Sequence, residues 1–329
     1  MSKVLITGAT GTVGFPIARD LVARGDEVRA LVRDVDRARK LLPQGVEPVA
    51  GDVADRGSVD RSVDGCELVF HAAGLPEQWR HDPADFQRVN VEGSRNLAEA
   101  SLAAGVGRFV YTSTIDVFQW TPGRPFDESV IDPDPRPTHY ERSKQEADRL
   151  VVSIADRGLE VVFIHPAAVY GPVPALFAGA NDFLVRLATG KIPMLLPGGM
   201  PVVYSEDVGR AHIEAADRAE AGSRFIVADR YLTLSEMAGS VAEIEPEAKN
   251  PRVMPLAVAR GVMAAGEGIA RITRKPPLIA RGELAFLVSH PVPVADRLRD
   301  ELGIEPTPWS DGLARTLEHF RAQGWSSAA

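Results

Sequence analysis

The sequence predicts an α/β protein that has a doubly wound parallel sheet and a smaller, mainly helical C-terminal part. Short apolar runs alternate with longer helix-like segments from residue 3 to about residue 165. A glycine-rich loop follows the first apolar run and opens the first helical segment. After about residue 170 the alternation ends, and proline and glycine interrupt the chain at 171–174 and 197–201. Strand–helix alternation of this kind predicts right-handed crossovers and helices on both faces of the sheet.

Each element is predicted from its own pattern. Helical patterns lie near 13–24, 36–42, 56–64, 84–104 and 138–157. These features predict a Rossmann-like dinucleotide-binding domain over 1–170 and a substrate-binding part over 171–329, from which some elements return to the sheet. The apolar runs expected to form buried strands are Lys3–Thr7, Val28–Val32, Val46–Ala50, Leu68–Ala72, Phe109–Thr112 and Val161–Ile164.

Composition excludes several classes of protein. The 329 residues carry a net charge of −8, which argues against a nucleic-acid partner because phosphate contacts need a basic surface. Cys66 is the only cysteine, so an internal disulfide is impossible and a reducing compartment is expected. No apolar run approaches the roughly 18 residues that span a membrane, and Lys3 leads into a short run unlike a signal peptide. We expect a cytoplasmic protein without stable membrane insertion.

The loop after the first strand predicts a nucleotide site. Glycines at positions 8, 11 and 14 permit a tight turn, a close approach of the backbone to a pyrophosphate and tight helix packing. The helix N-terminus then offers amides and a positive dipole end to the phosphates. The alternative is a purely structural role for these glycines, in a turn followed by a helix cap. The residues expected to contact a dinucleotide here are Gly8, Thr10, Gly11, Thr12 and Val13.

The end of the second strand bears on which dinucleotide binds. A carboxylate at this point usually holds the ribose hydroxyls of NAD, whereas a 2′-phosphate calls for an arginine. Arg33 stands where the strand is expected to end, and Asp34 follows it. The sequence therefore favours NADP(H), and Asp34 keeps NAD(H) possible.

Tyr140 and Lys144 are the candidate catalytic pair. Four residues apart on a helix, they lie on one face about one turn apart. A neighbouring ammonium group favours the phenolate, so we expect Lys144 to lower the pKa of Tyr140 and suit it to proton exchange. Thr138 and Glu141 have the spacing of a capping box, which would begin the helix at Thr138. The pair alone is weak evidence for catalysis, because this spacing often occurs by chance.

Seven motifs, in the right order, resemble those of the extended short-chain dehydrogenase/reductase superfamily, which is also called the NAD-dependent epimerase/dehydratase family. The resemblance covers most of the chain and implies an NAD(P)-dependent enzyme. The motifs are the Gly8, Gly11 and Gly14 loop, Gly51-Asp52-Val53, His71-Ala72-Ala73-Gly74, Asn90-Val91-Glu92-Gly93, Tyr111-Thr112-Ser113-Thr114, Tyr140-x-x-x-Lys144, and the segment from Pro166 through Val169 to Pro172.

The resemblance implies roles for individual residues. Tyr140 would be the general acid/base, and Lys144 would lower its pKa and hold the nicotinamide ribose. Thr114 would hydrogen-bond the substrate oxygen, with Ser113 as the second candidate. The remaining residues are expected at the cofactor: Asp52 and Val53 at the adenine; Ala72, Ala73 and Gly74 beside the cofactor; Asn90 in support of the lysine or in a structural hydrogen bond; Pro166 and Val169 on the nicotinamide side. No metal site is expected.

At several positions the residues of this chain differ from those of the sugar-nucleotide members of the superfamily, and these differences narrow the range of expected substrates. Those proteins usually have Val-Tyr-Gly where this chain has Val117-Phe118-Gln119, and arginine where this chain has His165. The chain looks more like the dihydroflavonol-reductase and 3β-hydroxysteroid-dehydrogenase branch. We therefore expect an oxidoreductase that interconverts a ketone and a secondary alcohol on an apolar small molecule. A nucleotide-sugar epimerase or dehydratase with tightly bound NAD is the first alternative, and a dinucleotide-sensing regulator is the second. A homodimer is the default expectation.

Overall fold

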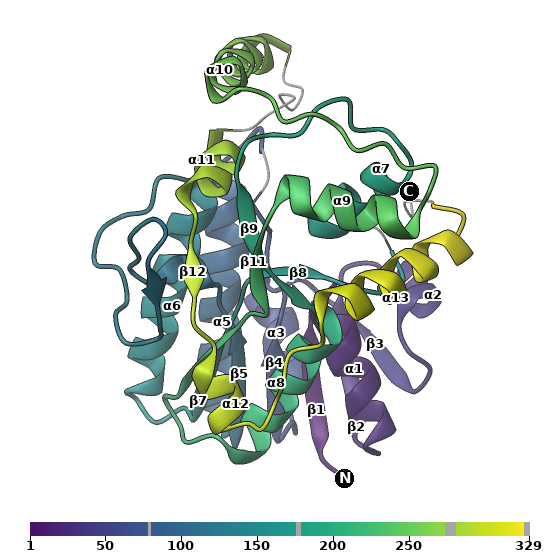
Figure 1. Ribbon diagram of the computed structural model, residues 1–329. Coiled ribbons are helices and arrows are strands. Elements are labelled where there is room, and N and C mark those ends of the chain that lie inside the picture. The colour runs from purple at the N-terminus through teal and green to yellow at the C-terminus, as the bar shows by residue number, and fades with distance from the viewer. Residues whose placement is uncertain (78–79, 176–178, 274–280, 326–329) are drawn as a thin grey trace.

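The computed structural model describes residues 1–77, 80–175, 179–273 and 281–325 (Figure 1). Its centre is a seven-stranded sheet, parallel throughout, in the order β10-β7-β5-β4-β1-β2-β3. This order reverses direction between β1 and β4, as in dinucleotide-binding sheets. The strands are β1 (Lys3–Thr7), β2 (Glu27–Val32), β3 (Val46–Ala50), β4 (Leu68–His71), β5 (Arg108–Thr112), β7 (Val161–Pro166) and β10 (Arg224–Val227).

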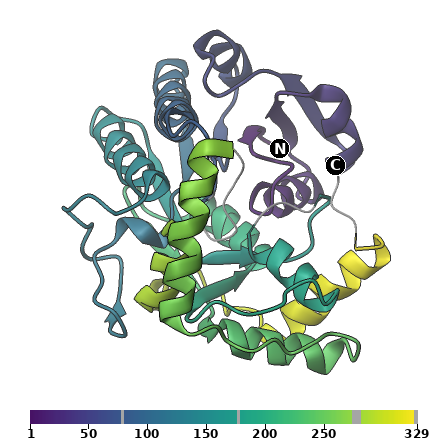
Figure 2. The same cartoon turned by 90° about the horizontal axis from the view of Figure 1, so that it is seen from above.

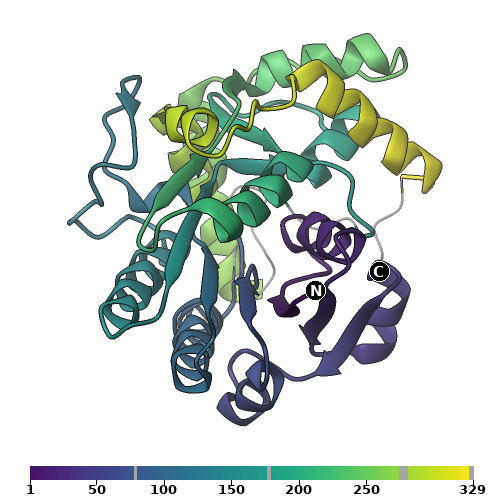
Figure 3. The same ribbon diagram turned by 90° about the horizontal axis from the view of Figure 1, so that it is seen from below.

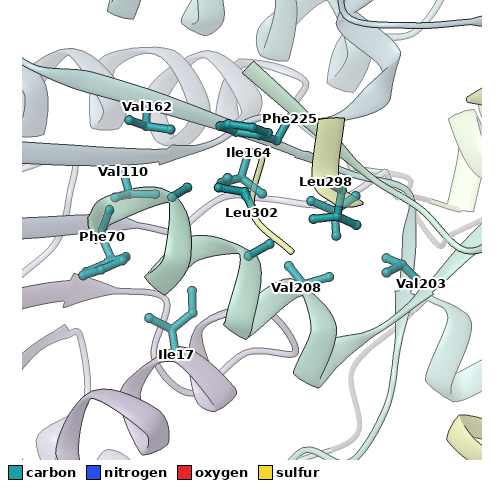
Figure 4. Close-up of a cluster of buried hydrophobic side chains, with 14 of the residues drawn as sticks. Ile17, Phe70, Val110, Val162, Ile164, Val203, Val208, Phe225, Leu298 and Leu302 are labelled. Carbon is teal, nitrogen blue, oxygen red and sulfur yellow. The ribbon is translucent and has the colours of Figure 1, made fainter. Parts of the chain in front are cut away.

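Helices cover both faces of the sheet, as Figure 3 shows from below. Helices α1 (Gly14–Ala23) and α8 (Ser205–Arg218) pack together on one face. Helices α3 (Arg56–Val63), α5 (Gly93–Ala104) and α6 (His139–Ala155) lie side by side on the other. Parallel strands buried on both faces are continuously apolar, which explains why the strand runs were readable in the sequence. Figure 4 shows the side chains between the sheet and the α1–α8 layer.

The predicted fold class is confirmed, and every predicted strand is present. One helix differs from its prediction, since the segment expected over 84–104 divides into α4 (Ala84–Phe86), a π-helical turn η1 (Gln87–Glu92) and α5. Helix α2 (Val35–Leu41) follows β2, and a 3₁₀ turn η2 (Ile115–Val117) follows β5. Short strands β6 (Pro125–Phe126) and β12 (Val292–Pro293) pair with each other and hold the proline-rich loop 121–137.

The remaining elements form a second layer above the carboxyl ends of the strands. Strands β8 (Ala168–Tyr170), β9 (Gly199–Tyr204) and β11 (Arg230–Thr233) make a small sheet. Helices α7 (Ala180–Ala188), α9 (Leu234–Ile244) and α13 (Trp309–Ala322) pack against one another beside it (Figure 2). Helices α10 (Leu256–Thr273) and α11 (Arg281–Ser289) complete this region, whereas α12 (Asp296–Asp300) packs against β10 of the main sheet. Within the described residues, no helix is long and apolar enough to cross a membrane.

Three buried histidines bridge elements of the sheet and its helices. His71 on β4 contacts the Thr7 hydroxyl at 2.8 Å and the Ser94 hydroxyl at 3.0 Å. His212 on α8 contacts the Thr112 hydroxyl at 2.8 Å. Burial lowers the pKa of His71 and of His165 to about 3, and that of His212 to about 4. All three are therefore neutral in the folded protein at neutral pH.

These histidines should make the protein less stable in mild acid. In the unfolded chain each takes up a proton below about pH 6.5, so the unfolded state binds more protons than the folded state. Each histidine should lower the free energy of unfolding by up to about 1.4 kcal/mol per pH unit between about pH 6.5 and its folded pKa. Urea denaturation at about pH 7, 6 and 5 measures this slope. His212→Gln should reduce the slope, whereas the same change at the exposed His139 should not; equal slopes would contradict the assignment.

Candidate active site

The glycine loop lies at the carboxyl end of β1, against the end of β4. Gly8 has a positive φ of 73°, and a Cβ there would lie 2.6 Å from the carbonyl oxygen of Ala72. A Cβ on Gly14 would fall on the backbone of Gly8. Two of the three glycines are therefore required by packing alone, because the turn, the first helix and β4 approach too closely for a side chain.

Gly11 is different, because its surroundings are open. A Cβ there would meet only the Gly8 carbonyl oxygen within 4 Å, at 3.2 Å. Helix α1 begins just beyond, and among the described residues no side chain caps its N-terminus. Thr10, Thr12 and Val13 lie around this turn and are partly exposed. The uncapped amides and the side-chain-free Gly11 fit a pyrophosphate, so the predicted cofactor cradle agrees with the geometry.

The segment after β4 closes one side of this cradle. The amide of Ala72 donates to the Thr7 carbonyl and the amide of Ala73 to the Thr7 hydroxyl, both at 3.2 Å. A Cβ on Gly74 would lie 3.3 Å from Oδ1 of Asn90. The structure thus brings Ala72, Ala73 and Gly74 to the carboxyl end of β1, where the resemblance places them.

Asp52 and Val53 follow β3 on the same edge of the sheet. One Asp52 oxygen accepts from the amide of Ala54 at 2.9 Å, which is the loop-capping role. The other oxygen makes no hydrogen bond within the described part of the chain. Val53 is buried against Gly93. Asp52 can therefore cap its loop and still present one oxygen to a ligand.

Arg33 and Asp34 separate in their roles. Asp34 caps α2, because its Oδ1 accepts from the amide of Arg37 at 2.9 Å. Arg33 is the first residue after β2, is exposed, and has no ion-pair partner among the residues that the structure describes. Both side chains can therefore contact a ligand at this edge of the sheet, Asp34 through its second oxygen.

Asn90 lies on the π-helical turn and is occupied by structural hydrogen bonds. Its Oδ1 accepts from the Leu75 amide at 2.7 Å, and its Nδ2 donates to the Ser143 hydroxyl at 2.9 Å. Nδ2 also contacts the Leu75 carbonyl at 3.2 Å. The structural alternative for Asn90 is therefore the one that this arrangement shows, since it joins the loop after β4 to α6.

The two candidate hydroxyls that follow β5 have different hydrogen-bond partners. Ser113 donates to Oδ2 of Asp148 at 2.7 Å and is directed into a buried network. Thr114 donates to Oδ2 of Asp116 at 2.8 Å, and its hydroxyl lies beside the Tyr140 hydroxyl, whose pKa it lowers. The geometry therefore pairs Thr114, and not Ser113, with the candidate acid/base.

Helix α6 holds Tyr140 and Lys144 at its first turns. The predicted capping box is confirmed, because Thr138 Oγ1 accepts from the Glu141 amide and the Glu141 carboxylate accepts from the Thr138 amide. The Lys144 ammonium donates to the Thr112 carbonyl at 2.8 Å and lies 5.1 Å from the ring centroid of Tyr111. Burial lowers the pKa of Lys144 to about 8.

The expected effect of Lys144 on Tyr140 is wrong for this arrangement. Burial raises the pKa of Tyr140 above its ordinary value, and the Asp116 carboxylate raises it further. The neighbouring Thr114 hydroxyl opposes this rise. The physical reason is that burial disfavours a phenolate, while the Lys144 ammonium is directed to a backbone carbonyl. Tyr140 is therefore a protonated phenol at neutral pH.

Sequence reasoning missed a buried ionic network beneath the site. Asp148, 1% exposed, receives two hydrogen bonds from Arg224 on β10, at 2.8 and 3.1 Å. Arg224 also contacts Nε2 of His165 at 3.1 Å, and Nδ1 of His165 lies 3.2 Å from the Thr114 carbonyl. One signal was available, because Asp148 follows Lys144 by four residues on the same face of the helix. His165 is fully buried.

The remaining predicted positions flank the site. Pro166 ends β7 and Val169 lies on β8. In the loop 121–137, Arg136 donates to the backbone carbonyls of Asp116 and Phe118 and lies 3.6 Å from the Trp120 ring centroid. These contacts fix the loop against η2, which supports a stiff connection beside α6.

The doubly wound sheet, the glycine cradle and the tyrosine–lysine helix together define a dinucleotide-binding enzyme. Residues 4–228 match the model of the NAD dependent epimerase/dehydratase family. The chain belongs to this family, which confirms the resemblance read from the motifs. The family is described as NAD dependent, one solved neighbour is titled as a complex with NAD, and several relatives have reductase names.

Three relatives illustrate the range of the family. Sterol demethylase protein B of Methylococcus capsulatus is 29% identical over 97% of this chain and 98% of its own length. A putative dihydroflavonol 4-reductase of Synechocystis is 27% identical over 97% of this chain and 95% of its own length. The UDP-glucose 4-epimerase of Thermus thermophilus, solved in complex with NAD, is 27% identical with a TM-score of 0.76, over 97% of this chain and 99% of that one.

We expect the phosphates of the cofactor to occupy the space beside Gly11. Gly11→Ala should weaken dinucleotide binding by at least about tenfold, because the new methyl group would occupy the phosphate approach. The free energy of unfolding should change by less than about 1 kcal/mol, since only one backbone atom is near. Fluorescence titration with NADPH and urea denaturation measure the two effects.

Gly239→Ala in α9 is the matched control, because nothing lies within 4 Å of its added Cβ. It should leave dinucleotide binding unchanged. Unchanged binding in Gly11→Ala would show that the cradle does not hold the phosphates.

Proposed function

We propose that the protein is an NADP-preferring oxidoreductase that interconverts a ketone and a secondary alcohol on an apolar small molecule. The observation that carries the proposal is the neighbouring pair of Tyr140 and Thr114 hydroxyls at the carboxyl end of β5, beside a cradle that fits a dinucleotide. When bound, the nicotinamide supplies or accepts the hydride. The protein supplies position and the proton.

The protonation state of Tyr140 favours reduction as the working direction. A protonated phenol can donate its proton to a carbonyl oxygen, and the Thr114 hydroxyl can donate a hydrogen bond to the same oxygen. Lys144 is positioned one turn along the helix to present an ammonium to a cofactor ribose and to stabilise negative charge left on Tyr140. Arg33 is the residue for a 2′-phosphate, and Asp52 the residue for the adenine.

An apolar substrate is supported by the names of two relatives and by the departures at Val117-Phe118-Gln119. One relative is named for sterol demethylation and another for dihydroflavonol reduction, and both names denote ring-bearing compounds. Within the described residues, no cluster of histidine, cysteine and carboxylate side chains could hold a metal.

Tyr140→Phe tests the acid/base role. The variant keeps the ring against Phe86 but removes the ionisable hydroxyl, so turnover should fall by at least about 100-fold. The assay follows NADPH oxidation with a panel of cyclic ketones, and NADP⁺ reduction with the matching alcohols. NADPH binding should persist in the variant, which separates loss of chemistry from loss of folding. A variant with full turnover would contradict the role.

Arg33→Ala tests cofactor choice. Removing a charged hydrogen bond to a phosphate costs about 1.5–3 kcal/mol, so the Kd for NADPH should rise by about ten- to a hundredfold while that for NADH changes little. Arg39→Ala is the control, because Arg39 is exposed and already paired with Asp36 at 3.2 Å. Tighter binding of NADH than NADPH by the unmodified protein would overturn the preference.

A sugar-nucleotide epimerase is the second candidate, favoured by the solved relative that has that activity in its title. Such an enzyme retains its dinucleotide through purification. Release of bound NAD on denaturing the purified protein, together with epimerisation of a UDP-sugar, would favour this function over ketone reduction.

A further inference from the structure

Asp116 is a buried carboxyl group that neither the fold nor the reaction described above requires. It lies on the 3₁₀ turn η2, two residues beyond Thr114, and is 6% exposed. One oxygen, Oδ2, accepts from the Thr114 hydroxyl at 2.8 Å. The other, Oδ1, is buried and has no hydrogen-bond partner among the described residues. A buried carboxylate oxygen without a partner is costly, so the group needs a physical explanation.

The charged groups around Asp116 do not neutralise it. Arg136, in the loop 121–137, donates to the backbone carbonyl of Asp116 at 3.0 Å, and no salt bridge to the Asp116 carboxylate is formed within the described chain. Glu141 on α6 repels it, whereas Arg136 and Lys144 attract it more weakly than burial disfavours its charge. Burial raises the pKa of Asp116 to about 7. The group can therefore gain or lose a proton at neutral pH.

A chain of neighbouring polar groups runs from this carboxyl group to the candidate acid/base. The Thr114 hydroxyl donates to Asp116 at 2.8 Å and lies beside the Tyr140 hydroxyl, whose pKa it lowers. The three groups come from α6, from the end of β5 and from η2, so no single element holds them together. A hydroxyl in the middle of such a chain can accept a proton from one neighbour and donate its own to the other.

We propose that Asp116 is the proton reservoir of the site and re-protonates Tyr140 through the Thr114 hydroxyl after each reduction. The proposal rests on the function proposed above. When the Tyr140 phenol gives its proton to the ketone oxygen, Thr114 gives its hydroxyl proton to the phenolate. Thr114 then takes the carboxyl proton of Asp116. The step leaves a neutral phenol, an intact hydroxyl and a carboxylate, and the carboxylate later regains a proton from water.

Infrared difference titration tests the reservoir without any substrate. The spectrum of the unmodified protein minus that of Asp116→Asn should contain a protonated carboxyl band that is lost as pH rises through about 7. In the same variant, ultraviolet titration should show a lower phenol pKa for Tyr140, because a repelling charge has been removed; Tyr140→Phe assigns the signal. A carboxyl group that titrates near its ordinary value of about 4 would overturn the proposal.

Kinetics test the relay itself. Asp116→Asn should lower kcat for ketone reduction by roughly ten- to a hundredfold and remove the loss of rate above about pH 7. Asp116→Glu should restore part of kcat and part of the loss of rate above about pH 7. Thr114→Ser should keep the relay because it keeps the hydroxyl. Asp132→Asn is the control for the surrounding loop, because Asp132 pairs with Arg136 at 3.2 Å but lies outside the hydroxyl chain; its pH profile should match the unmodified protein.

The two proposals fail in different ways. If the unmodified protein reduces no ketone on the panel, the proposed function is wrong, and the infrared titration still decides whether Asp116 holds a proton at neutral pH. If the unmodified protein turns over and Asp116→Asn retains its kcat and pH profile, the relay is wrong and the function stands. Thermal melting of each variant separates either result from a loss of folding.

Discussion

The buried pair between Asp148 and Arg224 is the contact on which the geometry of the site depends. Asp148 projects from α6, and Arg224 begins β10, 76 residues further along the chain. Burial disfavours the charge on Asp148, but the Arg224 guanidinium and the Ser113 hydroxyl hold its pKa below its ordinary value. Breaking a buried pair of this kind typically costs about 3–5 kcal/mol, because it leaves one charge unpaired. The pair therefore fixes α6 against the sheet.

That fixation determines where the reacting groups lie. Tyr140 and Lys144 occupy the two turns of α6 that precede Asp148, so a helix anchored by Asp148 can neither rotate nor slide. Lys144 reaches the carbonyl of Thr112 from this position, and Ser113 is held by the same carboxylate. With Ser113 turned inward, the next side chain, Thr114, is presented to Tyr140. Consecutive side chains of an extended chain point to opposite sides, which explains why the hydroxyls of Ser113 and Thr114 meet different partners.

The sequence allowed the fold to be predicted because its signals are local. Buried parallel strands are continuously apolar, the glycine loop marks the first crossover, and the Thr138–Glu141 capping box marks the start of α6. The choice between Ser113 and Thr114 could not be predicted, since it depends on Asp148 and Arg224, which are distant in the sequence. A charged residue inside the apolar run 115–118 was a signal for Asp116, although only the folded chain shows that its carboxylate lacks a partner.

The pKa of Tyr140 was mispredicted for an instructive reason. Helical spacing places a lysine beside a tyrosine, and that spacing alone suggests a phenolate. The folded chain adds two effects that spacing cannot show, namely burial and the Asp116 carboxylate, and both raise the pKa. A site that must deliver a proton to a carbonyl oxygen gains from holding the phenol protonated. It then needs a nearby source to replace that proton, and a carboxyl group that titrates near neutrality, one hydroxyl away, meets this need.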